Sequence, residues 1–216
     1  MMERNSSECL LKKLDEEIVL LDGAMGTMIQ QHKLEEKDFR IEALADHPNP
    51  LQGNNDLLSI TRPEIIEQIH TDYLEAGARI LGTNTFNAKR ISQQDYSLED
   101  YVEQLNRASV DVAQKAASRF EQDHPGEKVW IAGAIGPTNR TCSLSPDVQN
   151  PAYRALEFDE IVETYLEQAR ALMDAGADLL MFETTFDTLN LKAGIYAVEK
   201  LNDLYGRRTP VMLSVT

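Results

Sequence analysis

Short apolar runs alternate with longer segments of helical periodicity along most of the chain. The apolar runs cover residues 18–21, 79–86, 129–133, 178–182 and 211–215, and the loops after them are rich in Gly, Thr and Asn. β-branched residues and leucine dominate these runs, as is typical of strands that are buried on both faces. Strands that alternate with helices in this way favour an α/β fold with a parallel sheet.

The periodicity predicts four main helices between the strands. Thr61 is expected to cap a helix with Pro63 in its first turn, and Ser97 is expected to open a capping box for a helix that reaches about Phe120. A third helix over residues 161–175 should end at Gly176. The fourth, over residues 188–204, has Asp187 as its expected N-cap.

An internal repeat favours a barrel over an open sheet. Residues 76–86, AGARILGTNTF, and residues 175–186, AGADLLMFETTF, have the same order of helix end, strand and loop. Repeats are equivalent in a (β/α)8 TIM barrel, whereas edge and central strands of an open sheet differ. A complete barrel has eight strands and about 250 residues. With about five strands and four main helices, we expect an incomplete barrel over residues 18–216, truncated at its C-terminal end and preceded by an N-terminal lead, residues 1–17.

Composition and charge exclude several classes of protein. The 216 residues are 42% hydrophobic and 26% charged, which is ordinary for a soluble globular domain, and no apolar run is long enough to cross a membrane. A formal net charge of −15 without a block of Lys or Arg argues against nucleic acid and against anionic membranes as partners. The beginning of the chain lacks the apolar core of a secretory signal, so we expect a cytoplasmic protein.

Asp22 is the first candidate for ligand binding, because it follows an apolar run directly. In a (β/α) barrel the active site lies at the carboxyl ends of the strands. The carboxylate could receive a substrate ammonium group, and the N–H groups of Gly23 and Ala24 could receive a carboxylate. A turn aspartate that bonds to its own loop is an equally good interpretation.

Glu183, Asn84 and Thr85 follow two other strands. Five apolar positions lead into Glu183, and a carboxylate at the mouth of a packed barrel requires a cationic partner, which favours a binding role over a structural ion pair. Asn84 and Thr85 could hold a ligand or merely close their loop. Together these groups would suit an amino-acid zwitterion, but they specify no reaction.

The remaining candidates are weaker. Cys9 and Cys142 are far apart and form neither a disulfide framework nor a metal site. The four histidines have no spacing typical of metal ligands, and surface or packing roles are expected for His32, His47, His70 and His124. No metal ligand and no catalytic residue is identified in the chain.

Several of these segments resemble a known family. The motifs that carry the resemblance are Leu21–Thr27, Asn54–Leu58, Gly82–Phe86, Gly133–Thr138 and Phe182–Thr184. In this order and at these intervals they resemble the homocysteine S-methyltransferases, and within that family they are most similar to the cobalamin-dependent methionine synthases.

The resemblance implies a substrate and a reaction. L-homocysteine would lie in the barrel mouth, with its amino group near Asp22 and Glu183, its carboxylate near the backbone after Asp22, and Thr85 in the same pocket. In the family, zinc held by three cysteines binds the thiol, and methylcobalamin, recharged by a folate-dependent domain, supplies the methyl group.

The chain departs from the family pattern at the zinc ligands. Those cysteines belong to later strands of the family's barrel, and no cysteine follows Cys142. We therefore expect a truncated chain that neither binds the catalytic zinc nor turns over alone, with the cobalamin and folate domains in the full-length protein.

Three alternatives remain open. The methyl donor could be betaine or S-methylmethionine, or the chain could be a non-catalytic half-barrel that binds an amino acid. An isomerase or aldolase barrel would need a Schiff-base lysine or a phosphate site, and neither is visible. An open barrel edge would also favour self-association of the chain.

Overall fold

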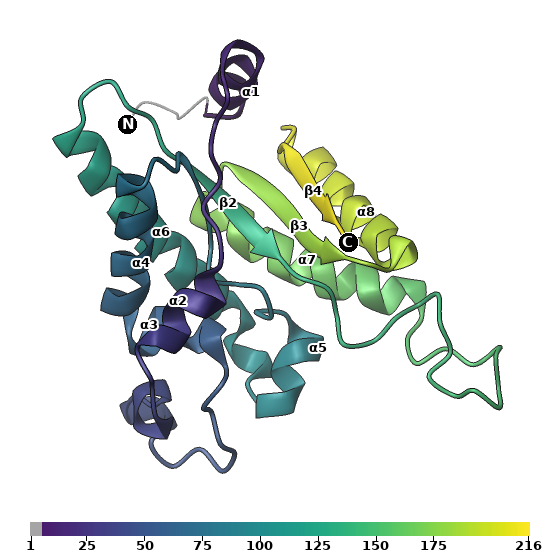
Figure 1. Cartoon of the computed structure of the whole chain (residues 1–216). Coiled ribbons are helices and arrows are strands. Elements are labelled where there is room, and N and C mark those ends of the chain that lie inside the picture. Colours follow the sequence, from purple (N-terminus) through teal and green to yellow (C-terminus); the bar gives the residue numbers. More distant parts are fainter. Residues whose placement is uncertain (1–5) are drawn as a thin grey trace.

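The computed structural model describes residues 6–216 as helices around one parallel sheet (Figure 1). The sheet has the order β1-β2-β3-β4, and every neighbouring pair is parallel. The strands are β1 (Ile80–Gly82), β2 (Trp130–Ile135), β3 (Leu179–Thr185) and β4 (Val211–Val215). This confirms the predicted α/β class, with strands that follow one another in space as they do in a (β/α) barrel.

The four predicted main helices are present. They are α4 (Pro63–Glu75), α6 (Val102–Asp123), α7 (Phe158–Ala175) and α8 (Thr188–Tyr205). Shorter helices are α1 (Ser6–Glu16), α2 (Met25–Gln31), α3 (Leu58–Thr61) and α5 (Arg90–Gln93). Single 3-10 turns lie at Glu36–Phe39, Glu42–Leu44, Asn55–Leu57, Gln94–Tyr96 and Glu99–Tyr101.

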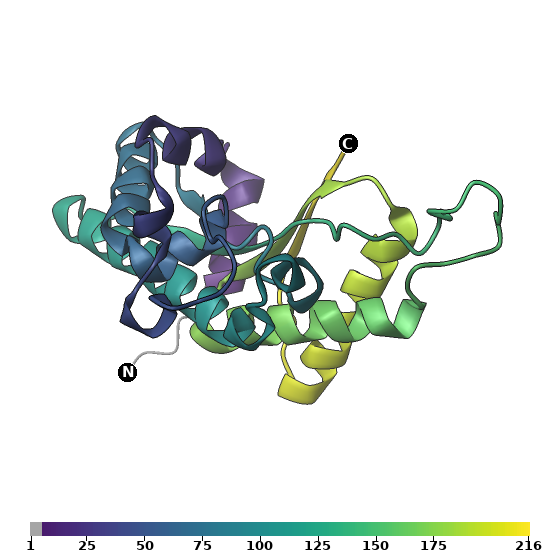
Figure 2. The same cartoon turned by 90° about the horizontal axis from the view of Figure 1, so that it is seen from below.

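Both faces of the sheet are covered by apolar side chains. Leu81, Ile131 and Leu180 belong to a core cluster with side chains of α6, α7 and α8. Figure 2 shows α7 and α8 along one side of the sheet. On the other face, Ile80 and Trp130 pack with Leu10 of α1. Helix α1 therefore belongs to the packed structure, although its residues fall in the segment expected to be a lead. Where the domain begins stays a prediction.

The prediction of a first strand over residues 18–21 was wrong. Only Leu21 pairs with the sheet, through a single parallel bridge to Ile80. Ile18 is 91% exposed and Leu20 is 53% exposed, so this segment lacks the cover that stabilises a strand. The sheet of residues 6–216 has four strands rather than five.

The predicted helix ends are partly correct. Gly176 ends α7 in the left-handed conformation, and the Asp187 side chain caps α8 by accepting hydrogen bonds from two backbone N–H groups. The other two caps were wrong. Thr61 is the last residue of α3, so Arg62 precedes Pro63 as N-cap. Ser97 adopts φ 55°, and α6 starts five residues later at Val102, after a 3-10 turn.

Among residues 6–216, none of the helices combines the length and the apolar character that crossing a lipid bilayer requires.

Candidate functional site

A pocket of about 670 Å³ lies at the carboxyl ends of the strands. Its wall is formed by the segment after Leu21, the loop at residues 53–56, the loop after β1 and the ends of β3 and β4. All six residues predicted to bind a ligand line it: Asp22, Gly23, Ala24, Asn84, Thr85 and Glu183. Their placement around one cavity follows from parallel strands, whose carboxyl ends meet on the same side of the sheet.

Asp22 is held at the pocket wall by β1. The backbone N–H of Gly82 donates to Oδ1 of Asp22 over 2.9 Å. Burial raises the pKa of Asp22 to about 7, with a smaller contribution from the negative charge of Glu183, while the bond from Gly82 opposes this rise. Asp22 is therefore partly protonated near neutral pH, and a cation placed next to it would favour its ionised form.

The backbone after Asp22 is open to a ligand. The N–H groups of Gly23 and Ala24 donate to no acceptor among residues 6–216. Tyr73 lies against the outer side of this turn, with its hydroxyl 3.7 Å from the position a Cβ on Gly23 would occupy. Two unpaired donors beside an acidic group suit a ligand that has both charges.

Glu183 stands at an irregularity in β3. The pairing of β3 with β4 shifts register between Phe182 and Thr185, and Thr184 has φ 55°. Bulges of this kind redirect side chains at the ends of strands. Burial raises the pKa of Glu183, whereas the nearby cation of Lys89 lowers it.

Asn84 and Thr85 line the pocket, but their polar groups are largely engaged by the protein. Asn84 Nδ2 donates to the carbonyl of Asn55 over 2.7 Å, which closes the neighbouring loop. The hydroxyl of Thr85 donates to the carbonyl of Ala134 over 2.7 Å. Of the two interpretations left open above, the observed bonds favour loop closure, and a direct role in binding stays a prediction.

Sequence reasoning missed two charged residues of the site. Asp56 is buried at the pocket wall, where its Oδ1 accepts from the backbone N–H of Asn87 over 2.8 Å. Lys89 is fully buried behind it, and its Nζ donates to the carbonyl of Phe86 over 2.6 Å. Burial raises the pKa of Asp56 to about 6 and lowers that of Lys89 to about 8.

These two buried residues form a charge cluster with the half-buried Glu183. Lys89 is the cation that acts on both carboxyl groups. The motif containing Asp56 was visible in the sequence, but nothing in the pattern around Lys89 distinguishes it from a surface lysine. Lys89 therefore supplies a nearby positive charge for Glu183, without a direct ion pair between the two side chains within residues 6–216.

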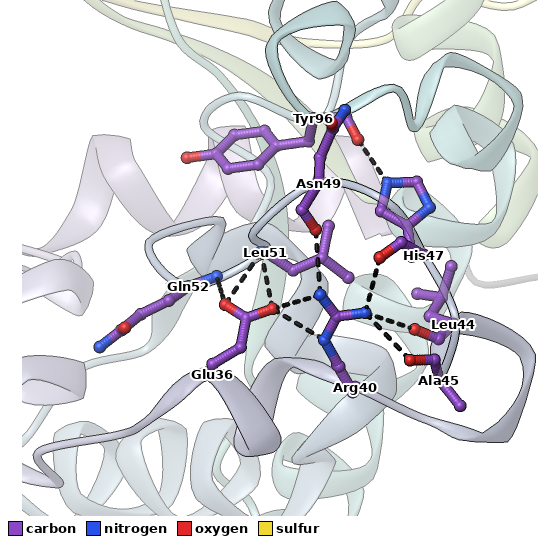
Figure 3. Close-up of polar contacts among 9 residues, drawn as sticks. All are labelled: Glu36, Arg40, Leu44, Ala45, His47, Asn49, Leu51, Gln52 and Tyr96. Atoms are coloured by element: carbon purple, nitrogen blue, oxygen red, sulfur yellow. Dashed lines mark hydrogen bonds and ion pairs between the residues drawn. The ribbon is translucent and has the colours of Figure 1, made fainter.

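An arginine clasp holds residues 44–52, the segment that precedes the pocket loop with Asp56 (Figure 3). The guanidinium group of Arg40 donates to four backbone carbonyl groups, those of Leu44, Ala45, His47 and Asn49. Glu36 accepts from Arg40 and also from the backbone N–H groups of Leu51 and Gln52. The irregular segment between α2 and the pocket is fixed by these charge-assisted bonds in place of regular structure.

The described residues do not fit a metal ion. Within residues 6–216, no group of three or more His, Cys, Asp or Glu side chains is placed to hold one. Cys9 is exposed on α1, whereas Cys142 is buried in the loop after β2. Within residues 6–216 the pocket therefore combines carboxyl groups with free backbone N–H groups, but offers no group of metal ligands.

The chain is similar to known methyltransferases. The family model described as homocysteine S-methyltransferase matches residues 19–216. The oxidized form of the homocysteine methyltransferase MmuM from Escherichia coli is 25% identical and superposes with a TM-score of 0.69 over 95% of this chain and 64% of that one. Its metallated form is 26% identical, with a TM-score of 0.67 over 92% and 63%.

This chain thus spans slightly less than two thirds of the MmuM chains. The fold agrees with them along nearly its whole length, and the matched region contains every pocket residue described above. The chain belongs to the homocysteine S-methyltransferase family.

Proposed function

We propose that residues 18–216 form the homocysteine-binding part of a cobalamin-dependent methionine synthase. The observation that carries this proposal is the arrangement of Asp22 and Glu183, which line the same pocket as the free N–H groups of Gly23 and Ala24. A family that acts on homocysteine needs such a site for the amino and carboxylate groups that all amino acids share.

In this proposal the substrate amino group lies between Asp22 and Glu183. Its positive charge favours the ionised form of both carboxyl groups, so binding would release the proton that burial keeps on Asp22. The substrate carboxylate accepts from the N–H groups of Gly23 and Ala24. The thiol then projects towards the open part of the pocket, where methyl transfer to sulfur gives methionine.

Zinc would supply the thiolate, because a bound metal ion lowers the pKa of a thiol. Since the described residues offer no suitable group of ligands, we assign no step to zinc here. We propose that its cysteine ligands belong to the barrel of a longer protein, which also contains the cobalamin and folate domains. The similarity to MmuM chains that are longer than this one supports the longer barrel, whereas the cobalamin and folate domains rest on the sequence resemblance.

A different methyl donor is the second candidate. The match of 25% identity to MmuM, described simply as a homocysteine methyltransferase, favours no particular donor. Betaine or S-methylmethionine therefore remains compatible with the same homocysteine site. The resemblance of Asn54–Leu58 to the cobalamin-dependent enzymes supports the first proposal.

Calorimetric titration of L-homocysteine into the chain tests the binding site. We expect Asp22→Asn and Glu183→Gln each to weaken binding at least about tenfold, which corresponds to the loss of one charge-assisted hydrogen bond. Asp203→Asn makes the same chemical change on the exposed side of α8 and should bind as the unmodified chain does. Unchanged affinity in both pocket variants would refute the proposed site.

We also propose that the chain self-associates through β4. This strand is the edge of the sheet within residues 6–216, and Leu213 and Val215 on it are exposed. Exposed apolar strand edges promote association. Light scattering coupled to size exclusion should show a dimer or larger species, and Val215→Lys should yield monomer. A monomer at every concentration would contradict this.

A further inference from the structure

His70 of α4 is buried next to Asp22 without a hydrogen-bond partner. Its side chain has 0% exposure, and neither ring nitrogen has a partner among residues 6–216. Nδ1 lies 3.8 Å from Oδ2 of Asp22. Buried polar groups in folded proteins are nearly always paired, so an unpaired imidazole directed at a pocket carboxylate requires an explanation.

The two oxygens of Asp22 are in different surroundings. Oδ1 accepts from the backbone of Gly82, whereas Oδ2 is the oxygen nearest His70. A separation of 3.8 Å is too long for a hydrogen bond, yet a small rotation of either side chain would close it. Contacts of this kind are often long in ligand-free sites and shorten when the substrate binds.

We propose that His70 is a positioning residue, whose Nδ1–H donates to Oδ2 of Asp22 whenever that carboxyl group is ionised. With Gly82 on one oxygen and His70 on the other, the carboxylate is fixed in orientation and its negative charge is stabilised. The substrate contact rests on the proposed function. The pairing of His70 with Asp22 is independent of the proposed function.

The charges around the pair fit this role. Burial lowers the pKa of His70 to about 4, so at neutral pH the imidazole is a neutral donor that keeps its own proton. Glu183, from β3, acts on Asp22 with a like charge, and Tyr73, also from α4, is the other titratable group that Asp22 influences. Neither Glu183 nor Gly82 can replace the donor on Oδ2.

The first test measures the protonation of Asp22 in the ligand-free chain by carboxyl ¹³C NMR. His70→Leu introduces an apolar side chain of similar size and removes the hydrogen-bond donor, so it should raise the pKa of Asp22 by about one unit. His70→Asn places an amide N–H near the former Nδ1 and should bring the pKa back towards its original value. An Asp22 pKa that is the same in all three proteins would overturn the proposal.

The second test observes the imidazole of His70 directly and does not depend on how His70→Leu folds. Imidazole ¹⁵N shifts should show the neutral ring protonated on Nδ1, and Asp22→Asn should move the Nδ1 signal. A ring protonated on Nε2, or one that is insensitive to Asp22→Asn, would identify His70 as a packing residue and contradict the inference.

L-homocysteine titrations separate this inference from the proposed function. A one-unit rise in the pKa of Asp22 predicts that His70→Leu weakens binding about tenfold at pH 6 and about twofold at pH 8. If the NMR shifts occur but Asp22→Asn leaves binding unchanged, the proposed function fails and the pairing stands. If Asp22→Asn abolishes binding and His70→Leu has no effect at either pH, the pairing fails and the function stands.

Discussion

The backbone N–H of Gly82 donates to Oδ1 of Asp22 across 2.9 Å and thereby joins the end of β1 to the segment that precedes α2. Among residues 6–216, the segment also meets the sheet through the Leu21–Ile80 bridge, through the backbone bonds on either side of it, and through Val19, which packs near Ile80. The bond therefore provides part of the attachment to the sheet that a complete first strand would provide. It also fixes the side chain on which the proposed substrate site depends.

Asp22 should make the stability of the chain depend on pH. Its pKa is about 7 in the folded chain and near its ordinary value of 3.8 in the unfolded chain. Between these values the unfolded state loses the proton and the folded state keeps it, so stability falls as pH rises from about 4 to 7. Asp22→Asn lacks this penalty and should be more stable than the unmodified chain at pH 8, on the order of 3 kcal/mol.

Urea unfolding of both proteins at pH 4 and pH 8 measures this difference. At pH 4 the two should have similar stability, because Asp22 is protonated in the folded state and the asparagine can accept the same bond from Gly82. Asp203→Asn, on the surface of α8, serves as the control and should show no such pH dependence. An equal difference at both pH values would contradict the burial of an ionisable Asp22.

Lys89 should hold down the pKa of its carboxyl neighbours, Asp56 and Glu183. With a pKa of about 8, Lys89 is charged at both pH 5 and pH 7, whereas Asp56, with a pKa of about 6, ionises between them. Lys89→Met should raise the pKa of Asp56, so the variant should lose about 1 kcal/mol more stability between pH 5 and pH 7 than the unmodified chain does. Thermal unfolding at the two pH values tests this.

The matched control for Lys89→Met is Lys200→Met. Lys200 lies on the surface of α8, 3.4 Å from Glu163, and exposed ion pairs of this kind contribute little. Its effect should be small and the same at both pH values. If the two substitutions had the same effect, Lys89 would influence its carboxyl neighbours no more than an exposed lysine does.

Gly194 should tolerate no side chain. A Cβ there would lie 2.3 Å from Cε1 of Phe182, the residue before Glu183 on β3, so Gly194→Ala should cost about 2 kcal/mol through overpacking. Gly26, also helical, has open space where its Cβ would be, and Gly26→Ala should be neutral or stabilise by up to about 1 kcal/mol. Denaturant midpoints compare the two, and equal effects would mean that α8 does not press on Phe182 at this point.

The stability that Arg40 provides should depend on the shape of its guanidinium group as well as on its charge. Arg40→Ala leaves four backbone carbonyls without their shared donor and should lower stability by about 3 kcal/mol. Arg40→Lys should recover less than half of this, because a single ammonium group cannot span the positions that the planar guanidinium reaches. Arg119→Ala, on the exposed face of α6, is the control. Full rescue by lysine would refute the clasp.

Much of the fold follows from the sequence because its long elements are locally consistent. The apolar stripe of α7 and the glycine that ends it, Gly176, predict that helix correctly. The first strand was misjudged because four apolar residues do not make a strand without neighbours that cover them, and Ile18 has none. Ser97 failed as a cap because a 3-10 turn intervenes before α6.

The pocket was predictable for residues that directly follow an apolar run of the sequence, such as Asp22 and Glu183, because these runs end at the same side of the sheet. Lys89 and His70 could not be found in this way. Lys89 follows an irregular loop, and His70 lies within a helix, where only the packing of α4 brings it to Asp22. Their environment arises from residues distant in the chain, which a single sequence does not reveal.

The most direct test of the homocysteine site is an amide NMR titration of the chain with L-homocysteine, compared with 4-sulfanylbutanoate, which lacks the amino group. The proposed site predicts that L-homocysteine shifts the signals of Gly23, Ala24 and Gly82 and leaves that of Gly206, after α8, unchanged. The analogue should bind at least about tenfold more weakly, because it cannot engage the two carboxylates. Equal binding of both compounds, or shifts that avoid the pocket, would contradict the proposed site.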